Sequence, residues 1–411
     1  MRIIFTIICF CGVFYTSAQR CVVADYPQLQ AASRPYGQGS PTGKDSRDTL
    51  PNEVIVIPVV IHLLYNDNSQ NISDQQILSQ ITALNQDYRR LNLDAVNTPA
   101  PFSNVAADTR ISFCLAKTGP DGKPTTGIIR KYTKESSFLA DDAVKFSSSG
   151  GDDAWDATQY LNIWVCNLFG RTLGYAVLPG SPLNKDGVVI KYSVFGTTGS
   201  VAAPYNKGRT ATHEIGHWLG LRHLWGDAVC GDDGIADTPP QQASNNSCAS
   251  FPHLSSCSIN QYGDMFMNFM DFTDDACMNL FTNGQKLAMR SLFAKGNPKN
   301  SFLNSIACDS SDVEASPVLP PVSEANDPVI TTYPNPFTNE ITISTKDAVD
   351  ITGSVLKLYN AIGKLYDTHI LQTQKTTLYL NNLPSGIYFI RIETGKKTHV
   401  YKMLKQSPNT R

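Results

Sequence analysis

The first hydrophobic segment of the chain is short and carries a positive charge before it and small residues after it. The apolar run 3–14 follows Arg2 and precedes Thr16, Ser17 and Ala18. A membrane-spanning helix needs roughly 20 apolar residues. A positive start, a short apolar stretch and a small-residue exit are instead typical of a secretory signal peptide. We therefore predict a signal peptide at residues 1–18, in preference to a short anchor or a buried strand.

The hydrophobic pattern of the next segment changes between that of strands and that of a helix. The predicted strands are β-branched or apolar runs at residues 54–61, 111–115, 161–166 and 188–192. Ser73 and Gln76 form a capping-box pattern before apolar residues that recur every three or four positions. These helical positions are Ile77, Ile81, Leu84, Tyr88 and Leu91. The order of elements predicts an α/β domain, with helices packed against a mixed twisted sheet.

Near the C-terminus the apolar residues fall in short runs that are separated by turn residues. The predicted strands are residues 340–345, 354–359, 376–380, 387–393 and 399–402. Asn381 and Asn382 provide one of the turn signals between them. Short strands at this spacing are typical of a small all-β sandwich. We place that domain at residues 329–411.

Two segments have no hydrophobic periodicity and mark the domain boundaries. Residues 19–50 hold scattered Gly, Pro, Ser and charged residues, which suits a pro-segment. Residues 309–328 are rich in Asp, Ser, Pro, Val and Glu, and their prolines favour a semi-extended linker. The α/β domain then occupies residues 51–308.

Composition narrows the classes of function. The chain has 411 residues, with 34 Lys and Arg against 36 Asp and Glu, and a formal net charge of -2. No large basic excess is present to neutralise phosphates, so generic nucleic-acid binding is not expected. Hydrophobic residues make up 41% of the chain, enough to build cores and to exclude disorder of the whole chain. We expect no transmembrane segment.

Export to an oxidising compartment changes how the cysteines are interpreted. Of the ten cysteines, Cys9 and Cys11 would leave with the signal peptide. Those that remain are Cys21, Cys114, Cys166, Cys230, Cys248, Cys257, Cys277 and Cys308. Clustered cysteines in a secreted protein are most simply disulfides, although spacing alone leaves their pairing open.

The chemistry-bearing residues are concentrated in the segment 212–223. His213 and His217 are four apart, so a helix places both imidazoles on one face, where they can bind a tetrahedral zinc ion. Glu214 projects beside the metal and can accept a proton from a metal-bound water. Gly220 allows the chain to leave the helix, and His223 returns as a third ligand. Three protein ligands leave one position for water, as in catalytic sites. Three of the seven histidines lie in this segment, which argues against ordinary surface histidines.

The motif resembles that of the metzincin metallopeptidases, in which HExxHxxGxxH is followed by a methionine turn. Residues 268–272 look like this turn, and Met270 would underlie the zinc ligands. The run from residue 208 to residue 239 resembles the pappalysin family, and the resemblance covers roughly residues 53–308. It implies a metzincin catalytic domain that hydrolyses peptide bonds, with Glu214 as general base. Peptide substrates would lie extended against an edge strand, for which residues 187–192 are the candidate.

The resemblance also implies a calcium site and two disulfides. Asp233 and Thr238 match the side-chain ligands of the family's calcium loop, with the Ala236 carbonyl between them. A solvated acidic turn is the alternative. The cysteines match an interleaved pattern that implies Cys230–Cys257 and Cys248–Cys277. The partners of the other cysteines stay open.

Two positions near the methionine turn bear on rate and specificity. Relatives often carry Tyr where this chain has Phe272, so one oxyanion donor is missing and turnover is in question. Asp275 matches the position of an acidic residue at the base of the pocket for the residue after the scissile bond. This implies cleavage before Arg or Lys. The alternative is that Asp274 and Asp275 form a solvated turn.

The family further implies that the precursor is latent, with Cys21 as a zinc ligand in place of water. The sequence Arg20-Cys21-Val22 lacks the Gly that often follows such a cysteine. A disulfide between Cys21 and another unassigned cysteine is the alternative.

The C-terminal domain resembles the sorting domains of the type IX secretion system. The matching segments are residues 333–337, 360–364 and 383–389, in that order, within residues 329–405. The resemblance implies passage across the outer membrane by type IX machinery, followed by release or surface attachment. The alternative is an adhesive or carbohydrate-binding sandwich.

Together these features predict a secreted zinc-dependent endopeptidase, with calcium as a structural ion and proteins or peptides as substrates. A surface adhesin, or a binding protein with a non-catalytic metal-stabilised domain, is the alternative. Neither of these has a need for Glu214, so the intact glutamate favours the enzyme.

Overall fold

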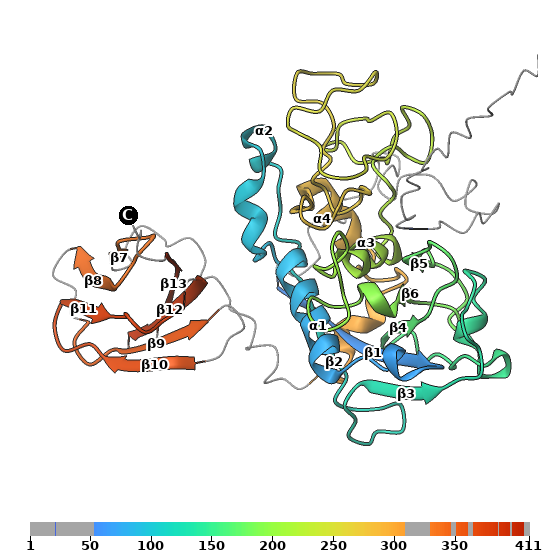
Figure 1. Ribbon diagram of the computed structural model, residues 1–411, viewed down its shortest axis with the longest axis horizontal. Coiled ribbons are helices and arrows are strands. Elements are labelled where there is room, and N and C mark those ends of the chain that lie inside the picture. The colour runs from blue at the N-terminus through green and yellow to red at the C-terminus, as the bar shows by residue number, and fades with distance from the viewer. Residues whose placement is uncertain are drawn as a thin grey trace, which may run out of the picture. The chain divides into compact units, whose positions relative to one another are not determined.

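The computed structural model describes Cys21 and residues 53–308, 329–346, 351–360, 365–384, 386–394 and 397–406. The predicted signal peptide, the predicted linker and most of the predicted pro-segment lie outside these residues. The chain divides into two compact units, Met1–Ala315 and Ser316–Arg411 (Figure 1). Among the described residues, no helix has the length and apolar character needed to cross a membrane.

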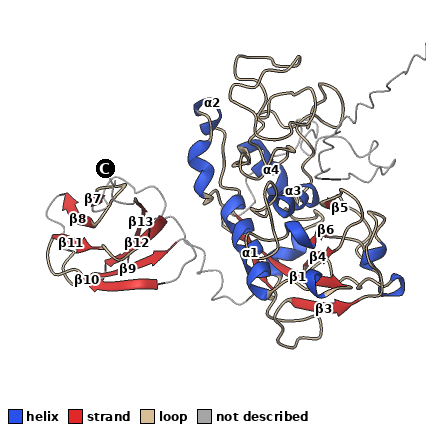
Figure 2. Cartoon of the chain, viewed as in Figure 1, coloured by secondary structure: helices blue, strands red, loops and turns tan. Residues whose placement is uncertain are grey.

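The first unit combines a sheet with helices (Figure 2). Its strands are β1 (Ile55–Tyr65), β2 (Ile111–Leu115), β3 (Ile128–Tyr132), β4 (Leu161–Cys166), β5 (Gly174–Ala176) and β6 (Val188–Lys191). Its α-helices are α1 (Asp74–Tyr88), α2 (Ala100–Ser103), α3 (Arg209–Trp218) and α4 (Asn283–Ser291). Short 3₁₀ helices lie at Asn68–Gln70, Leu93–Asn97, Ala143–Lys145, Ser147–Ser149, Tyr192–Val194 and Asn300–Asn304. This mixed α/β architecture confirms the predicted fold class.

The sheet has the strand order β2-β1-β4-β6-β5, and β3 pairs with β1 beyond the end of β2. All neighbours are parallel except β5, which runs antiparallel to β6. The expectation that residues 187–192 form an edge strand is wrong, because β6 is hydrogen-bonded to β4 on one side and β5 on the other. The continuous apolar run Val188–Ile190 is typical of a strand buried inside a parallel sheet. The edge strand β5 is only three residues long, too short to give a hydrophobic pattern.

The two faces of the sheet are covered differently. Alternate residues of β1, such as Ile57 and Ile61, belong to one core together with residues of α1 and α3, including Leu84 and Ile215. Successive strand residues point to opposite faces, and Leu64 therefore packs in a separate cluster with loop residues such as Phe138. Both long helices thus lie on one face of the sheet, and this face carries the residues of the candidate site.

Helix α1 begins where the capping pattern predicts, because the Ser73 side chain accepts a hydrogen bond from the Gln76 N–H at 3.2 Å. The helix ends at Tyr88, so Leu91 lies outside it, although its apolar spacing continues the pattern. The Tyr88 hydroxyl donates to the Thr212 carbonyl at 3.0 Å and so joins α1 to α3.

The second unit is all-β and consists of two antiparallel sheets, which confirms the predicted architecture. Its strands are β7 (Val329–Tyr333), β8 (Glu340–Lys346), β9 (Val355–Asn360), β10 (Leu365–Ile370), β11 (Lys375–Tyr379), β12 (Gly386–Thr394) and β13 (Lys397–Lys405). The sheets have the orders β10-β9-β12-β13 and β11-β8-β7. Residues of both sheets, such as Ile343 and Ile390, share one hydrophobic cluster. The sequence pattern did not predict β7 and β10.

Candidate metal centre

Helix α3 carries two of the three histidines of the motif, and every one of its residues is buried. His213 and His217 lie one turn apart on the same face. The helix ends at Trp218, and Gly220, with a φ of +85°, then lets the chain turn back. The Leu221 N–H then bonds to the Gly216 carbonyl at 2.9 Å, and the chain returns so that His223 faces the helix.

The three imidazoles converge through their Nε2 atoms. The Nε2 of His217 lies 3.0 Å from that of His213 and 3.0 Å from that of His223, and the remaining separation is 3.3 Å. Each Nδ1 has an acceptor of its own: the Phe269 carbonyl at 2.7 Å, the Leu221 carbonyl at 2.8 Å and the Asp227 carboxylate at 2.5 Å, in the order of the histidines.

This arrangement fixes the chemistry of the cluster. If each Nδ1 donates its proton to the acceptor beside it, three unprotonated Nε2 atoms point their lone pairs at one another. A cation at the centre resolves that repulsion, and neutral imidazoles are the common form of histidine metal ligands. Burial lowers the pKa of His217 to about 3, and the charge of His223 adds to the effect. The cluster is therefore suited to a metal ion.

The turn at residues 268–272 lies directly under this cluster. The Met270 side chain packs against α3, and a Cβ on Gly216 would come within 2.4 Å of its Sδ. Gly216 is thus needed for the close approach of the methionine. Phe272 contacts the rings of His213 and His223, with centroid separations of 5.6 and 4.8 Å. Phe272 therefore places an apolar ring beside these two histidines.

Glu214 lies beside the histidines and is fully buried. It packs against the edge strand β5, where a Cβ on Gly174 would come within 2.9 Å of its Cγ. Its Oε2 lies 3.3 Å from the Sγ of Cys21. The Cys21 backbone forms a parallel bridge with Gly174, so this cysteine reaches the site along β5. The Cys21 Sγ and one nitrogen of each histidine all lie within 4.8 Å of one another.

Asp275 is fully buried at the start of α3. Its Oδ2 accepts hydrogen bonds from the backbone N–H groups of Lys207 at 2.8 Å and Arg209 at 3.3 Å. The Arg209 guanidinium donates to the backbone carbonyl of Asp275 and to the carboxylates of Asp94 at 2.7 Å and Asp87 at 3.4 Å. Asp275 therefore does not form the solvated turn that was considered as the alternative.

The acidic loop after the third histidine places Asp233 and Thr238 together. The Thr238 hydroxyl lies 2.8 and 3.0 Å from the two carboxylate oxygens of Asp233. Burial raises the pKa of Asp233 to about 7, and the charges of Asp232 and Asp237 add to the shift. Asp237 is directed to the start of α4, where it accepts bonds from the Thr282 hydroxyl at 2.6 Å and the Gly284 N–H at 2.8 Å.

The structure contains three disulfides among the described residues: Cys114–Cys308, Cys230–Cys257 and Cys248–Cys277. The last two are the pairs that the family resemblance implies. Cys166 is buried in β4 and forms no disulfide among the described residues. Cys114 and Cys308 are 194 residues apart, so nothing local in the sequence points to their pairing.

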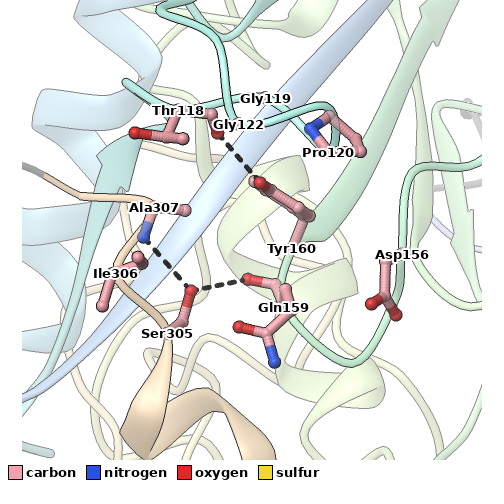
Figure 3. A pocket seen from close by; sticks show the side chains of 10 residues that line it. All are labelled: Thr118, Gly119, Pro120, Gly122, Asp156, Gln159, Tyr160, Ser305, Ile306 and Ala307. Atoms are coloured by element: carbon pink, nitrogen blue, oxygen red, sulfur yellow. Dashed lines mark hydrogen bonds between the residues drawn. The ribbon is translucent and has the colours of Figure 1, made fainter.

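A cavity of about 240 Å³ lies away from the histidines, between the loop at residues 118–122 and residues 305–307 (Figure 3). Figure 3 shows the Tyr160 hydroxyl bonded to the Thr118 carbonyl, and Ser305 bonded to the Gln159 carbonyl. Its lining includes none of the motif residues. The three histidines are therefore not part of this cavity.

Two groups of residues at the site were missed by the sequence interpretation. Asp227 binds the Nδ1 of His223, and Trp225 stacks on the His223 ring at a centroid separation of 4.4 Å. Asp227 could have been suspected because it follows the third histidine and metal-binding histidines commonly donate to a carboxylate. The second group is Arg209 with Asp87 and Asp94, whose ion pairs connect distant parts of the sequence.

Two regions of the chain match models of known protein families. A peptidase family model described as pregnancy-associated plasma protein-A matches residues 146–294, and a secretion system C-terminal sorting domain matches residues 331–406. An extracellular metalloprotease of Coccidioides posadasii is 31% identical over 250 residues, which cover 58% of this chain and 77% of that protein.

Solved structures agree with these matches. Mature mirolysin of Tannerella forsythia, in complex with a cleaved peptide, is 50% identical with a TM-score of 0.61; the match covers 63% of this chain and all of that one. A mutant of promirolysin from the same organism is also 50% identical, with a TM-score of 0.62, and covers 63% of this chain and 88% of that chain.

Proposed function

The chain belongs to the pappalysin family of metallopeptidases and is a secreted metalloendopeptidase, and from this premise we propose that it cleaves peptide bonds at a zinc ion held by His213, His217 and His223. The observation that carries the proposal is the convergence of three Nε2 atoms at separations of 3.0 to 3.3 Å. Nitrogen ligands of a tetrahedral zinc ion, each about 2.0–2.1 Å from the metal, lie about 3.3 Å apart. The observed separations are within about 0.3 Å of this value, so the three histidines suit a zinc ion.

Glu214 is the proposed general base. When bound, zinc supplies Lewis-acid activation of a water molecule and of the peptide carbonyl. Glu214 would take a proton from the water as the water oxygen bonds to the peptide carbon, and would pass it to the amine that leaves when the C–N bond breaks. Its burial and its contact with the glycine of the edge strand hold the carboxylate beside the three histidines. Because β5 is the edge strand that contacts Glu214, it is also the proposed place for an extended substrate backbone.

We propose that Cys21 keeps the precursor latent. The thiolate of a cysteine is a strong zinc ligand. The Cys21 Sγ and the three histidine nitrogens all lie within 4.8 Å of one another. Its backbone bridge to Gly174 occupies the same edge strand that a substrate would need. Removal of the pro-segment, proposed as residues 19–50, would clear both positions. The similarity to a promirolysin supports the proposal that the chain is made as a zymogen.

The proposed preference is for Arg or Lys after the scissile bond, with Asp275 as its origin. At the start of α3, the buried Asp275 lies beside a charged group in which Asp87 and Asp94 pair with Arg209, and Asp94 also pairs with Lys207. A buried carboxylate favours a cationic partner. Asp275 also accepts hydrogen bonds from the N–H of Arg209, the first residue of α3, and from that of Lys207 just before the helix, so its position is fixed.

Calcium is proposed as the ion of the acidic loop. Asp233, Thr238 and the Ala236 carbonyl supply hard oxygen ligands, which suit calcium. The side chains of Asp233 and Thr238 are already in contact. Bound calcium would compensate the buried negative charge at Asp233, whose ionisation is costly because of burial.

The second unit is the sorting domain of the type IX secretion system, and it indicates secretion and localisation at the cell surface. We propose that residues 329–411 act through the type IX machinery and that residues 309–328 are the linker between the two domains. The alternative function, an adhesin with a metal-stabilised domain, would have no use for the buried Glu214 beside the metal ligands.

The deciding experiment compares the wild-type enzyme with Glu214→Ala and Glu214→Gln in a casein assay. We expect both variants to bind one zinc ion and to lose activity by about 100- to 10,000-fold, because only the proton carrier is removed. A chelator should inactivate the wild-type enzyme, and added zinc should restore it. Wild-type turnover in either variant would overturn the assignment of Glu214.

Specificity is tested by sequencing the products of a peptide library. Asp275→Asn keeps the shape of the side chain and removes its charge, whereas Ala would also remove an anchor of α3. We expect the preference for Arg or Lys to fall by about 10- to 100-fold, equivalent to about 1–3 kcal/mol. Asp274→Asn, one residue away, is the matched control and should keep the preference. Unchanged enrichment in Asp275→Asn would show that the carboxylate does not select the substrate.

A further inference from the structure

We propose that Asp227 is a positioning residue for the metal ligand His223, and that it sets the affinity of the site for its metal. This inference rests on the proposed function, because it concerns a metal ion held by the three histidines. Asp227 lies in the loop after the motif, four residues beyond His223. Neither its spacing nor the family match assigns it a role.

The three metal ligands differ in the partners of their Nδ1 atoms. His213 and His217 donate to backbone carbonyls, whose positions are set by the fold. His223 donates to a carboxylate oxygen of Asp227 at 2.5 Å. A carboxylate is the stronger acceptor; it fixes the tautomer with the proton on Nδ1 and makes the Nε2 a better electron donor toward a metal.

His223 also needs an external partner more than the other two ligands. It lies outside α3, whereas His213 and His217 are held by helical backbone. Trp225 stacks on one face of its ring, with 4° between the planes, but stacking does not prevent rotation of the ring within its own plane. The bond to Asp227 removes that remaining freedom. We therefore infer that Asp227 orients the His223 ring so that its Nε2 points at the other two Nε2 atoms.

Asp227 has a left-handed backbone conformation, which is uncommon for residues other than glycine. Gly226 and Asp227 have successive positive φ values of +55° and +58°. A Cβ on Gly226 would come within 2.5 Å of the Asp232 carbonyl oxygen, and a Cβ on Gly231 within 2.4 Å of the Trp225 carbonyl oxygen. Close packing of two backbone segments thus sets the turn, and Asp227 is aimed at His223 by this turn.

Asp227 has little part in the core. Its side chain is 49% exposed, and among the described residues the His223 side chain is the one to which it is hydrogen-bonded. Removal of the carboxylate should therefore change metal binding far more than it changes the stability of the metal-free fold. This difference separates a positioning role from a structural role.

The test measures the zinc dissociation constant of the full chain by competition with a chromogenic chelator. All proteins carry Glu214→Ala so that they do not cleave themselves. We expect Asp227→Ala to weaken zinc binding roughly 10- to 100-fold, as is typical when an outer partner of a metal ligand is lost. Asp227→Asn keeps an acceptor without the charge and should fall between Ala and the parent. Asp121→Asn, an exposed carboxylate in another loop, is the control and should leave the constant unchanged.

Two further measurements make the outcome decisive. The cobalt-substituted Asp227→Ala protein should show an altered visible absorption spectrum, because the third nitrogen has moved. The melting temperature of the metal-free protein should stay the same. Unchanged zinc affinity in Asp227→Ala would overturn the proposal, and so would a loss of metal-free stability with normal affinity in Asp227→Asn. Failure of the parent protein to bind zinc at all would instead overturn the proposed function.

Discussion

The two halves of the metal centre are built in different ways. The helical half is α3, with His213, His217 and Glu214, and all of its residues are buried. The loop half is residues 219–282, all described, in which no named helix or strand lies between α3 and α4. The first half is positioned by packing against the sheet and α1. The second must be positioned by other means.

The loop half depends on cross-links and on buried polar bonds. The interleaved disulfides Cys230–Cys257 and Cys248–Cys277 join its segments. The buried carboxylate of Asp271 accepts bonds from the Gln241 side chain at 2.9 Å and from the Asn245 backbone and side chain at 2.8 Å each. A metal site can thus take two ligands from a packed helix and a third from a stapled loop. The halves should respond differently to mutation, ions and pH.

The largest effect is expected from the helical half. His217→Ala should lose the metal and reduce proteolysis by at least about 1,000-fold, because two ligands no longer define the site. Metal analysis and a peptide assay measure both losses. His253→Ala removes a histidine of the loop half that lies outside the cluster, and it should keep metal and activity. One metal ion per chain in purified His217→Ala would contradict the assignment of this ligand.

The next largest effect is expected from the Cys230–Cys257 disulfide. Its replacement by two serines should cost about 3–4 kcal/mol, the value for a closed loop of this length. Hydrogen exchange should rise within residues 226–262 and much less within α3, since the two halves are held independently. The matched control is serine replacement of Cys114 and Cys308, which should leave exchange in residues 226–262 unchanged. Equal acceleration in both halves would show that they unfold as one unit.

Calcium should stabilise the loop half by a smaller amount. At a concentration of about 100 times its dissociation constant, a bound ion contributes about 2.7 kcal/mol. We expect EGTA to lower the melting temperature of the wild-type protein and to have little effect on Asp233→Asn, which lacks a ligand carboxylate. Calorimetry with and without calcium measures this difference. A melting temperature that does not depend on calcium would remove the ion from the site.

The smallest effect is a pH dependence caused by Asp87 of α1, which contacts Arg209 and Thr212 of the helical half. Burial raises the pKa of Asp87 to about 6, since the opposing charge of Arg209 is shared with Asp94. A carboxyl whose pKa is higher in the folded state than its unfolded value of about 3.9 favours folding while it is protonated. Its contribution therefore decreases as the pH rises from about 4 to 6 and is constant above that range.

This pH dependence is measured by comparing the wild type with Asp87→Asn, whose side chain does not titrate. The free energy of unfolding of the wild type, relative to that of the variant, should fall by on the order of 1–2 kcal/mol between pH 4 and pH 6. Chemical denaturation at a series of pH values measures it. A relative stability that rises over the same range would show that the ion pair with Arg209 outweighs burial.

Much of the local structure could be predicted from the sequence, because its signals are local. The capping residue Ser73 fixed the start of α1, and the strands at residues 111–115 and 161–166 match β2 and β4 to the residue. β5 was not predicted, since a strand of three residues has no pattern to detect. The role of β6 was predicted wrongly, because an apolar run does not say which strand lies on each side of it.

The candidate site likewise has features that the local sequence predicts and features that depend on contacts between distant segments. The spacing of His213, His217 and His223 was enough to predict that three imidazoles meet, since a helix and a glycine turn act over a few residues. Only the tertiary structure decided that Cys21 reaches them along β5, across 193 residues from Glu214. The same holds for the pairing of Cys114 with Cys308, and for Arg209 with Asp87. Contacts between distant segments depend on how the chain packs in three dimensions, and one sequence carries no local record of that packing.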